Sequence, residues 1–358
     1  MPHRSGRRLH YSVVGLVLLA ISVIPAALMP VFLVQAQVSS PSPPPTAPGP
    51  VAIEVGARPI AYFDQRDSSR VRFGSLEFVS GVALTSSFRG FGGLSGLRLD
   101  AKGERFTALS DKGDWFTGRL VYRGKQLTGL ADVQTAPILG PDGLPVGKRG
   151  WFDTESLAVD GDTAYVGIER VNQILRFETF GRDGVRAHGE PITAPPALRR
   201  LPFNKGLESL VTVPRNLPLG GTLIAISERG LDPGGNTLAF LLGGPSPGQF
   251  TIRRTNDFDI SDAAILPSGA LLILERKFSV VAGVGIRIRR IPLSSIVPDR
   301  LVDGAVIFEA DLANEVDNME GLDVHETPEG DTILTMVSDD NFSLIQRTLL
   351  LQFKLVEP

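Results

Sequence analysis

Short apolar runs occur in pairs along the chain from about residue 51 to the end, and a turn rich in glycine, proline or aspartate separates the members of each pair. The clearest example is LAVDGDTAYVGIER (157–170), in which two apolar runs flank Asp-Gly-Asp. Short apolar runs joined by such a turn predict a β-hairpin. Four more segments have the same pattern: 97–113, 210–230, 263–278 and 322–341.

Each hairpin begins near a small or acidic residue and ends near an acidic one. The first-strand positions are Ser95, Glu155, Glu208, Asp262 and Glu320, spaced 60, 53, 54 and 58 residues apart. The second-strand positions are Asp111, Glu169, Glu228, Glu275 and Asp339. A hairpin repeat of this period predicts the blades of a β-propeller, because one four-stranded blade uses roughly 40 to 50 residues.

We therefore predict an all-β fold, a β-propeller with five or six four-stranded blades. Five blades are visible directly, and residues 51–94 leave room for a degenerate sixth. A solenoid is the competing repeat architecture, but even spacing of short antiparallel pairs favours a closed ring. Closure should pair 71–79 with 348–356, which would remove the exposed edges of the sheet.

The N-terminal segment differs in composition from this body. Three arginines (Arg4, Arg7 and Arg8) precede an uncharged apolar run that ends near Ala36, and a stretch rich in serine and proline follows. This layout predicts a signal peptide or signal anchor over 1–36, a linker over 37–50 and a propeller domain over 51–358. A buried N-terminal helix is the alternative. We expect an exported protein, periplasmic or extracellular, that contacts a membrane only through this segment if it stays uncleaved.

Composition excludes several classes of site. The chain has no cysteine, so disulfides, thiolate metal sites and cysteine nucleophiles are absent. The formal net charge is −3 and basic residues are interleaved with acidic ones, which argues against nucleic acid as a partner. GGLSG (92–96) lacks the spacing of a serine nucleophile elbow, and the sequence has no P-loop or H-E-x-x-H motif. We expect a monomer that acts on a small molecule.

The acidic hairpin ends carry the candidate chemistry. The two ends of an antiparallel hairpin lie side by side, so the acids of several blades would meet at one mouth of the central channel if these hairpins are innermost. Clustered carboxylates need cations or basic neighbours to stay ionised. Arg170, Arg229 and Arg276 directly follow second-strand acids, and Ca²⁺ favours several carboxylate oxygens. The structural alternative is that these acids and arginines only join one blade to the next through ion pairs.

Several motifs, in their order along the chain, resemble the phytase-like family described as "esterase-like activity of phytase". They are GGLSGL, SDKG, DTESL, NKGLESL, ERG, DAAILPSGALLILER and NMEGLDV. The resemblance covers nearly all of 70–355 and implies a β-propeller related to calcium-dependent phytases, with calcium in an acidic channel. It carries across the motif acids Glu155, Glu208, Asp262 and Glu320, but no nucleophile.

Two hypotheses follow. In the first, the protein is an exported phytase-like or esterase-like hydrolase of an anionic phosphoester or an ester. Calcium would be held by Glu155, Glu208, Asp262 and Glu320, with Glu155 and Glu208 as catalytic bases. Four basic residues would orient the substrate: Lys112, Arg170, Lys205 and Arg229. In the second, the protein is a non-catalytic exported propeller that binds a ligand or partner at the cell envelope, since fold alone does not ensure catalysis.

Overall fold

The computed structural model of the chain describes residues 48–279 and 283–356. All of them belong to one unit, Pro45–Pro358. The expected signal or anchor over 1–36 lies outside the described residues, as does the expected linker except for 48–50. In the part that is described, no helix is long and apolar enough to cross a membrane.

The described residues form five antiparallel blades, whose strands run in order from the innermost outward. Blade 1 contains β5 (Leu94–Leu99), β6 (Arg105–Ser110), β7 (Asp114–Arg123) and β8 (Gln126–Pro137), with β1 (Val51–Ala52) at its edge. Blade 2 contains β9 (Thr154–Asp160), β10 (Thr163–Ile168), β11 (Gln173–Phe177) and β12 (Glu190–Pro191). Blade 3 contains β13 (Leu207–Thr212), β14 (Thr222–Leu231), β15 (Thr237–Gly243) and β16 (Gly248–Ile252), with β20 (Leu301–Val302) parallel to β16.

The last two blades hold the ends of the ring. Blade 4 contains β17 (Asp259–Leu266), β18 (Ala270–Ser279), β19 (Gly283–Pro292) and β21 (Ala305–Asp311). Blade 5 contains β22 (Asn318–Glu326), β23 (Thr332–Asp339), β24 (Thr348–Leu355) and β4 (Leu76–Thr85), and β4 also pairs with β2 (Gly56–Ile60) and β3 (Arg72–Phe73). Helical segments are short, such as α1 (Phe180–Asp183) and α2 (Pro196–Arg199).

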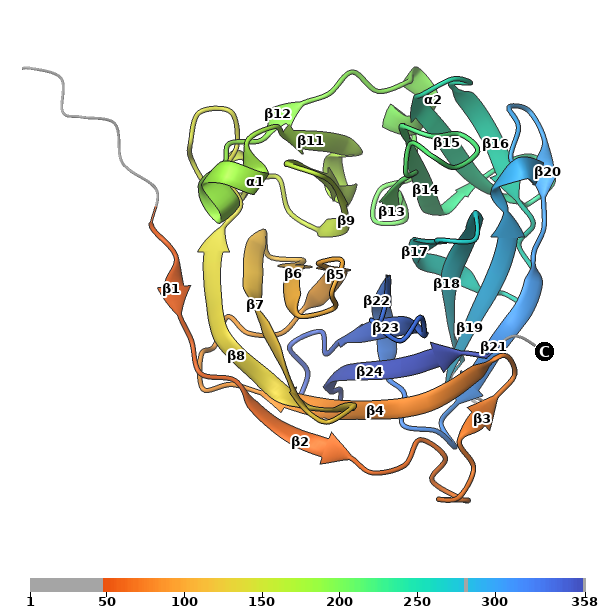
Figure 1. Ribbon diagram of the computed structural model, residues 1–358. Coiled ribbons are helices and arrows are strands. Elements are labelled where there is room, and N and C mark those ends of the chain that lie inside the picture. The colour runs from red at the N-terminus through yellow and green to blue at the C-terminus, as the bar shows by residue number, and fades with distance from the viewer. Residues whose placement is uncertain (1–47, 280–282, 357–358) are drawn as a thin grey trace, which may run out of the picture. The chain divides into compact units, whose positions relative to one another are not determined.

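The predicted hairpins form the two innermost strands of the five blades, so the all-β propeller prediction is confirmed (Figure 1). Ring closure is confirmed as well: β4 pairs antiparallel with β24, with Leu76 opposite Leu355 and Leu84 opposite Thr348. Residues 51–94 form no sixth blade. They supply outer strands to blades 1 and 5 and then the start of β5.

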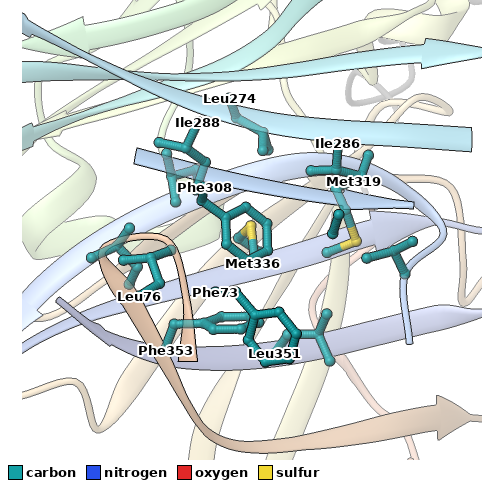
Figure 2. Packing of buried hydrophobic residues seen from close by; sticks show 14 of the residues in the cluster. Phe73, Leu76, Leu274, Ile286, Ile288, Phe308, Met319, Met336, Leu351 and Phe353 are labelled. Atoms are coloured by element: carbon teal, nitrogen blue, oxygen red, sulfur yellow. The ribbon is translucent and has the colours of Figure 1, made fainter. Parts of the chain in front are cut away.

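Apolar side chains fill the space between the blades. Between blades 4 and 5, Phe308 and Phe353 lie close together (Figure 2), 5.1 Å apart by ring centroid. Both also contact the ring of Phe63. All three are buried, and the same cluster includes Met319 and Met336 of blade 5. Burying one such side chain contributes roughly 1.5–3 kcal/mol, so these interfaces hold the inner strands in fixed positions around the axis.

Each innermost strand contains a register shift near the end where it begins. One residue is left unpaired there, and these residues are Ser95, Glu155, Glu208, Ser261 and Glu320. A β-bulge re-aims the side chain of its extra residue and often lies next to a functional site. Three of these residues, Glu155, Glu208 and Glu320, line the cavity at the mouth of the channel. The hydroxyls of the other two, Ser95 and Ser261, donate to the carbonyls of Thr154 and Met319 in neighbouring blades.

Candidate functional site: an acidic bowl at one mouth of the propeller

The bulge residues meet the ends of the second strands at one mouth of the ring. On each second strand, one residue follows directly after the partner of the residue that precedes the bulge. These residues are Asp111, Glu169, Glu228, Arg276 and Asp339. We call the cavity at this mouth the acidic bowl. It has a volume of about 880 Å³, and acidic side chains outnumber basic ones in its lining: Asp111, Asp153, Glu155, Glu169, Glu208, Glu228, Asp259, Asp317, Glu320 and Asp339 against Lys205, Arg229, Arg276 and Lys277.

Blade 4 departs from the register that the sequence pattern predicted. Its bulge residue is Ser261, and Asp262 lies one position further, where the other blades have Gly96, Ser156, Ser209 or Gly321. The second strand is offset in the same way, because Glu275 pairs with Ile260 and Arg276 takes the position that faces the bowl. The sequence alignment of this blade was wrong by one residue on both strands.

Asp262 consequently lies away from the other three predicted ligands and pairs with Arg98 of β5. The Arg98 guanidinium contacts both carboxylate oxygens, at 2.9 and 3.2 Å, and also donates to the carbonyls of Leu210 and Leu322. The backbone N–H of Leu322 donates to Asp262 as well. Burial raises the pKa of Asp262, and Arg98 opposes that shift. This buried pair joins strands of four blades across the axis, which is a structural role.

Glu275 also points away from the bowl, into blade 4. Its carboxylate accepts from Arg287 Nε at 2.7 Å and from Arg289 Nη2 at 2.5 Å, and all three side chains are buried. Arg289 in turn donates to Asp303 at 2.7 Å. These arginines lie on the adjacent strand β19, so the network joins two strands of one blade and occupies both oxygens of the Glu275 carboxylate.

One half of the bowl contains its own cations. Arg276 Nη2 lies 3.1 Å from Glu320 and 3.4 Å from Glu208, and Lys205 Nζ lies 2.8 Å from Glu228. Oxygens of Glu169, Glu208 and Glu228 approach within 4.8 Å of one another. Burial lowers the pKa of Arg276, but the charges of Glu320 and Glu208 outweigh it and raise that pKa. We call this side, with Glu169, Glu208, Glu228 and Glu320, the compensated half.

Three acids on the other side, Asp111, Glu155 and Asp339, form no ion pair among the described residues, and we call them the uncompensated half. Asp111 Oδ1 is a buried oxygen with no hydrogen-bond partner in the described part of the chain, and Asp339 accepts from the backbone N–H of Asn341, at 2.6 Å. Within 48–279 and 283–356, no group donates to the Glu155 carboxylate. Lys112 follows Asp111 in sequence, but its ammonium lies over the ring of Phe342.

The pKa values of the bowl acids reflect this burial. Burial and the charges of Glu320, Glu169, Asp111 and Asp339 raise the pKa of Glu155 well above its ordinary value. Burial, then the charge of Glu320, raises the pKa of Asp339 to about 8. Burial also raises the pKa of Asp111 to about 6 and, against a hydrogen bond from Gly206, that of Glu169 to about 7. Burial and the charge of Glu228 raise the pKa of Glu208 as well.

The four predicted substrate-binding cations lie around the bowl at different distances from its acids. Lys205 and Arg229 line it, and the Arg229 guanidinium pairs with Asp259 at 2.5 Å. Arg170 pairs with Asp153 at 2.9 Å and does not line the cavity itself. Lys112 is not in the lining either.

The structure therefore brings three of the four predicted ligands to one bowl: Glu155, Glu208 and Glu320. The sequence analysis missed the position of Arg276 in the ring and the pairing of Arg98 with Asp262. The small residue that follows the bulge was the available signal. A Cβ on Gly96 or Gly321 would contact the neighbouring inner strand at 3.1–3.2 Å, so this position is normally small. An acid there, as in blade 4, marks a changed register.

Comparisons with known proteins give one family and several distant structures. A family model described as "Phytase-like: Esterase-like activity of phytase" matches residues 89–342. No curated protein matches the sequence.

Three solved structures show the level of structural similarity. A gluconolactonase from Xanthomonas campestris is 14% identical with a TM-score of 0.40, covering 87% of this chain and 89% of that one. A glutaminyl cyclase from Myxococcus xanthus is 13% identical with a TM-score of 0.37, covering 74% and 92%. A protein from Thermus thermophilus described as a putative oxidoreductase (glucose dehydrogenase) is 15% identical with a TM-score of 0.33, covering 83% of this chain and 100% of that one. Likeness at these TM-scores does not establish a shared function.

Proposed function

Because the chain belongs to the phytase-like family, we propose that it is an exported hydrolase of a phosphoester or ester, and that calcium binds in the acidic bowl. One observation supports this proposal above the others. The acids of the uncompensated half line a cavity of about 880 Å³ without a basic partner of their own among the described residues. Buried carboxylates without a counter-charge are unfavourable, and perturbed carboxylates in a cleft mark candidate functional sites.

The residues present fit a hard cation. Calcium takes six to eight oxygen ligands in flexible geometry, and the bowl offers carboxylate oxygens from several strands. Asp111 Oδ1 is buried and has no partner in the described chain, which is the kind of oxygen that a cation would satisfy. The carboxylate oxygens of Asp111, Glu155 and Asp339 do not all lie within 4.8 Å of one another, as those of Glu169, Glu208 and Glu228 do. We propose that the three side chains of the uncompensated half move together around one ion. Glu169, Glu208 and Glu228 are close enough to hold another, but Arg276 and Lys205 already neutralise part of their charge.

The predicted ligand set changes accordingly. Glu155 and Glu208 stay in the proposal as members of the two groups. Glu320 lines the bowl but pairs with Arg276 at 3.1 Å and belongs to neither group. Asp262 does not stay in the proposal, because Arg98 and the backbone N–H of Leu322 occupy its oxygens. Calcium bound in the bowl would lower the pKa of an attacking water and offset negative charge on the substrate.

The chain's own groups have distinct roles in this proposal. Glu155 has no hydrogen-bond donor among the described residues, so one carboxylate oxygen can contact the ion while the other accepts a proton from water, as the general base. Glu208, held by Arg276 at 3.4 Å, is the second candidate base. Lys205 and Arg229 each contact one acid and keep unused donors toward the cavity, where they can bind the oxygens of an anionic group.

Export is a separate part of the proposal and rests on the N-terminal sequence. Arginines, an apolar run and a polar linker form the layout of a signal or anchor. Cell fractionation tests it: the protein should occur in the periplasm, the medium or the membrane fraction. Recovery of full-length protein only in the cytoplasm would contradict it.

Hydrolysis can be tested with the purified protein on aryl esters, phosphomonoesters and phytate, in calcium chloride and in excess EGTA. We expect turnover of at least one class in calcium and its loss in EGTA. The Glu208→Gln variant should lose most of that turnover. The matched Glu329→Gln control, at an exposed turn between β22 and β23, should keep it. No calcium-dependent turnover of any class would refute the proposal and favour the non-catalytic propeller.

A further inference from the structure

Large apolar side chains are unusually exposed around the mouth that holds the acidic bowl. Leu344 is fully exposed, and Ile345, Phe278 and Phe203 are 90%, 76% and 67% exposed. Each lies on a segment next to a bowl residue: Phe203 precedes Lys205, Phe278 follows Arg276, and the other two belong to the loop after Asp339. We call these four side chains the apolar lip. Exposed apolar groups gathered in one place mark binding sites, whereas single ones are ordinary.

The apolar lip is continuous with the bowl. Phe278 and Ile345 line the same cavity as Glu155 and Glu208. On the side of blades 2 and 3, the ring of Phe203 lies 5.3 Å from the Arg170 guanidinium carbon. A ligand bound among the acids can therefore place an apolar group against Phe278 and Ile345.

The charges of the bowl favour some ligands over others. Its acids outnumber its cations, and Lys205, Arg229 and Arg170 each already contact one acid. A polyanion with many phosphates would bring more negative charge than these cations can offset. A molecule with a single anionic or ester group brings no more negative charge than these cations can offset. A large apolar group on the same molecule could pack against the apolar lip.

We propose that the bowl binds amphiphilic esters, in which one phosphoester or carboxylic ester enters among the acids and an alkyl or aryl group of about six carbons or more lies on the apolar lip. This inference rests on the proposed function, because it names the substrate class of the same site. The lip supplies apolar contact area, and the bowl supplies the groups that hold the polar end. A protein partner or a second copy of the chain on the lip is a different occupant, which the experiment below detects.

The test compares hexylphosphonate with methylphosphonate, non-hydrolysable probes that share one head group. Their binding to the purified protein is measured by titration calorimetry in calcium chloride, below the concentration at which hexylphosphonate aggregates. Burial of two of the five extra methylene groups corresponds to about 10-fold tighter binding, so we expect at least that preference. Equal affinity for the two probes, or no binding of either, would overturn the proposal.

Variants locate the preference. The triple variant Phe203→Ser, Leu344→Ser, Ile345→Ser changes exposed side chains only, so it should fold, bind methylphosphonate like the wild type and lose the preference for the hexyl chain. A matched control is Val297→Ser, Leu301→Ser, Val306→Ser, which changes exposed apolar residues of the outer ring and should keep the preference. A triple lip variant that keeps the preference would contradict the proposal. A wild-type dimer that this variant makes monomeric would assign the lip to a second copy instead.

Hydrolysis of short and long acyl esters separates this inference from the proposed function. Calcium-dependent hydrolysis without any chain-length preference would leave the proposed function standing and remove the apolar lip from it. Preferred binding of hexylphosphonate without hydrolysis of any ester would refute the proposed function but keep the further inference. The protein would then be a propeller that binds amphiphiles.

Discussion

Two sets of acids look alike in the sequence repeat but differ completely in their surroundings. Asp262 and Glu275 of blade 4 are buried against Arg98, Arg287 and Arg289, with their oxygens occupied. The acids of the uncompensated half, at equivalent places in other blades, have no ion pair among the residues that the structure describes. A shift of one residue relative to the bulge separates the two sets. In this repeat, the register turns the blade 4 acids away from the bowl, and within the bowl the position of Arg276 separates the paired acids Glu208 and Glu320 from Glu155.

The two sets should therefore respond oppositely to neutralisation. Removing one partner of a buried ion pair leaves an uncompensated charge and typically destabilises by about 3–5 kcal/mol. Removing one of several repelling carboxylates relieves repulsion and burial of charge. We expect the largest effect on stability from a substitution that breaks a buried ion pair, and the smallest from a substitution at the edge of the bowl.

The Glu275→Gln substitution should have the largest effect on folding. It leaves Arg287 and Arg289 buried with a neutral partner, so the free energy of unfolding should fall by about 3 kcal/mol or more. Urea denaturation of the variant and of the exposed control Glu329→Gln measures the difference. A loss below about 1 kcal/mol would mean that this network is not structural.

The Glu155→Gln substitution should act on catalysis instead. We expect a loss of about 100-fold or more in kcat, the range for removal of a general base, with a calcium-free stability equal to or above that of the wild type. Hydrolysis rates and urea denaturation in EGTA give the two quantities for one preparation. A stability loss similar to that of Glu275→Gln would assign Glu155 to the structural set.

Calcium-free stability should depend on pH in an unusual direction. Glu169 and Asp339 have folded pKa values of about 7 and about 8, above their unfolded values of 4.5 and 3.8. Between pH 5 and 8 the folded protein binds more protons than the unfolded one, so the free energy of unfolding should decrease as pH rises. Taken together, the two groups give a decrease of up to about 6 kcal/mol over this window, and we expect a clearly smaller one in Asp339→Asn.

Urea denaturation in EGTA at several pH values between 5 and 8 measures this slope. A wild-type stability that is flat or rises with pH over this window would contradict the raised pKa values of the bowl acids.

The smallest effect is expected at the edge of the bowl. Arg170→Ala removes a half-exposed ion pair with Asp153, and such pairs contribute about 0–1 kcal/mol. Stability should change little, while KM for an anionic substrate rises a few-fold and kcat is kept. Arg170→Lys is the matched control, and an unchanged KM in Arg170→Ala would remove Arg170 from substrate binding.

Much of the fold could be predicted from the sequence because its determinants are local. Each hairpin carries its own apolar runs and turn, and 348–356 could be matched to an early strand by its apolar pattern. The register of blade 4 could not be predicted in this way. The bulge adds one residue to each first strand, and its position cannot be read from the apolar pattern. Asp262 and Glu275 are each displaced by one residue, so the spacing between them stays close to that of the acid pairs in the other blades.

The compensation of charge could not be predicted either, because it depends on residues far apart in the chain. Arg98 and Asp262 are separated by 164 positions, and their contact follows only from closing the ring. The pKa of an acid depends on whether it has a charged or hydrogen-bonding partner and on how deeply it is buried. Both are properties of the assembled blades. The sequence could therefore identify the acids but not divide them into two sets.

The most direct test of this division is the melting temperature in calcium chloride compared with EGTA. A ligand of the folded state at about 100 times its Kd adds about 2.7 kcal/mol, which corresponds to a rise of about 4 °C for a chain of this size. We predict this rise in the wild type, a much smaller one in Glu155→Gln, and the full rise in Glu275→Gln despite its lower starting value. No rise in the wild type, or an equal rise in Glu155→Gln, would contradict the account.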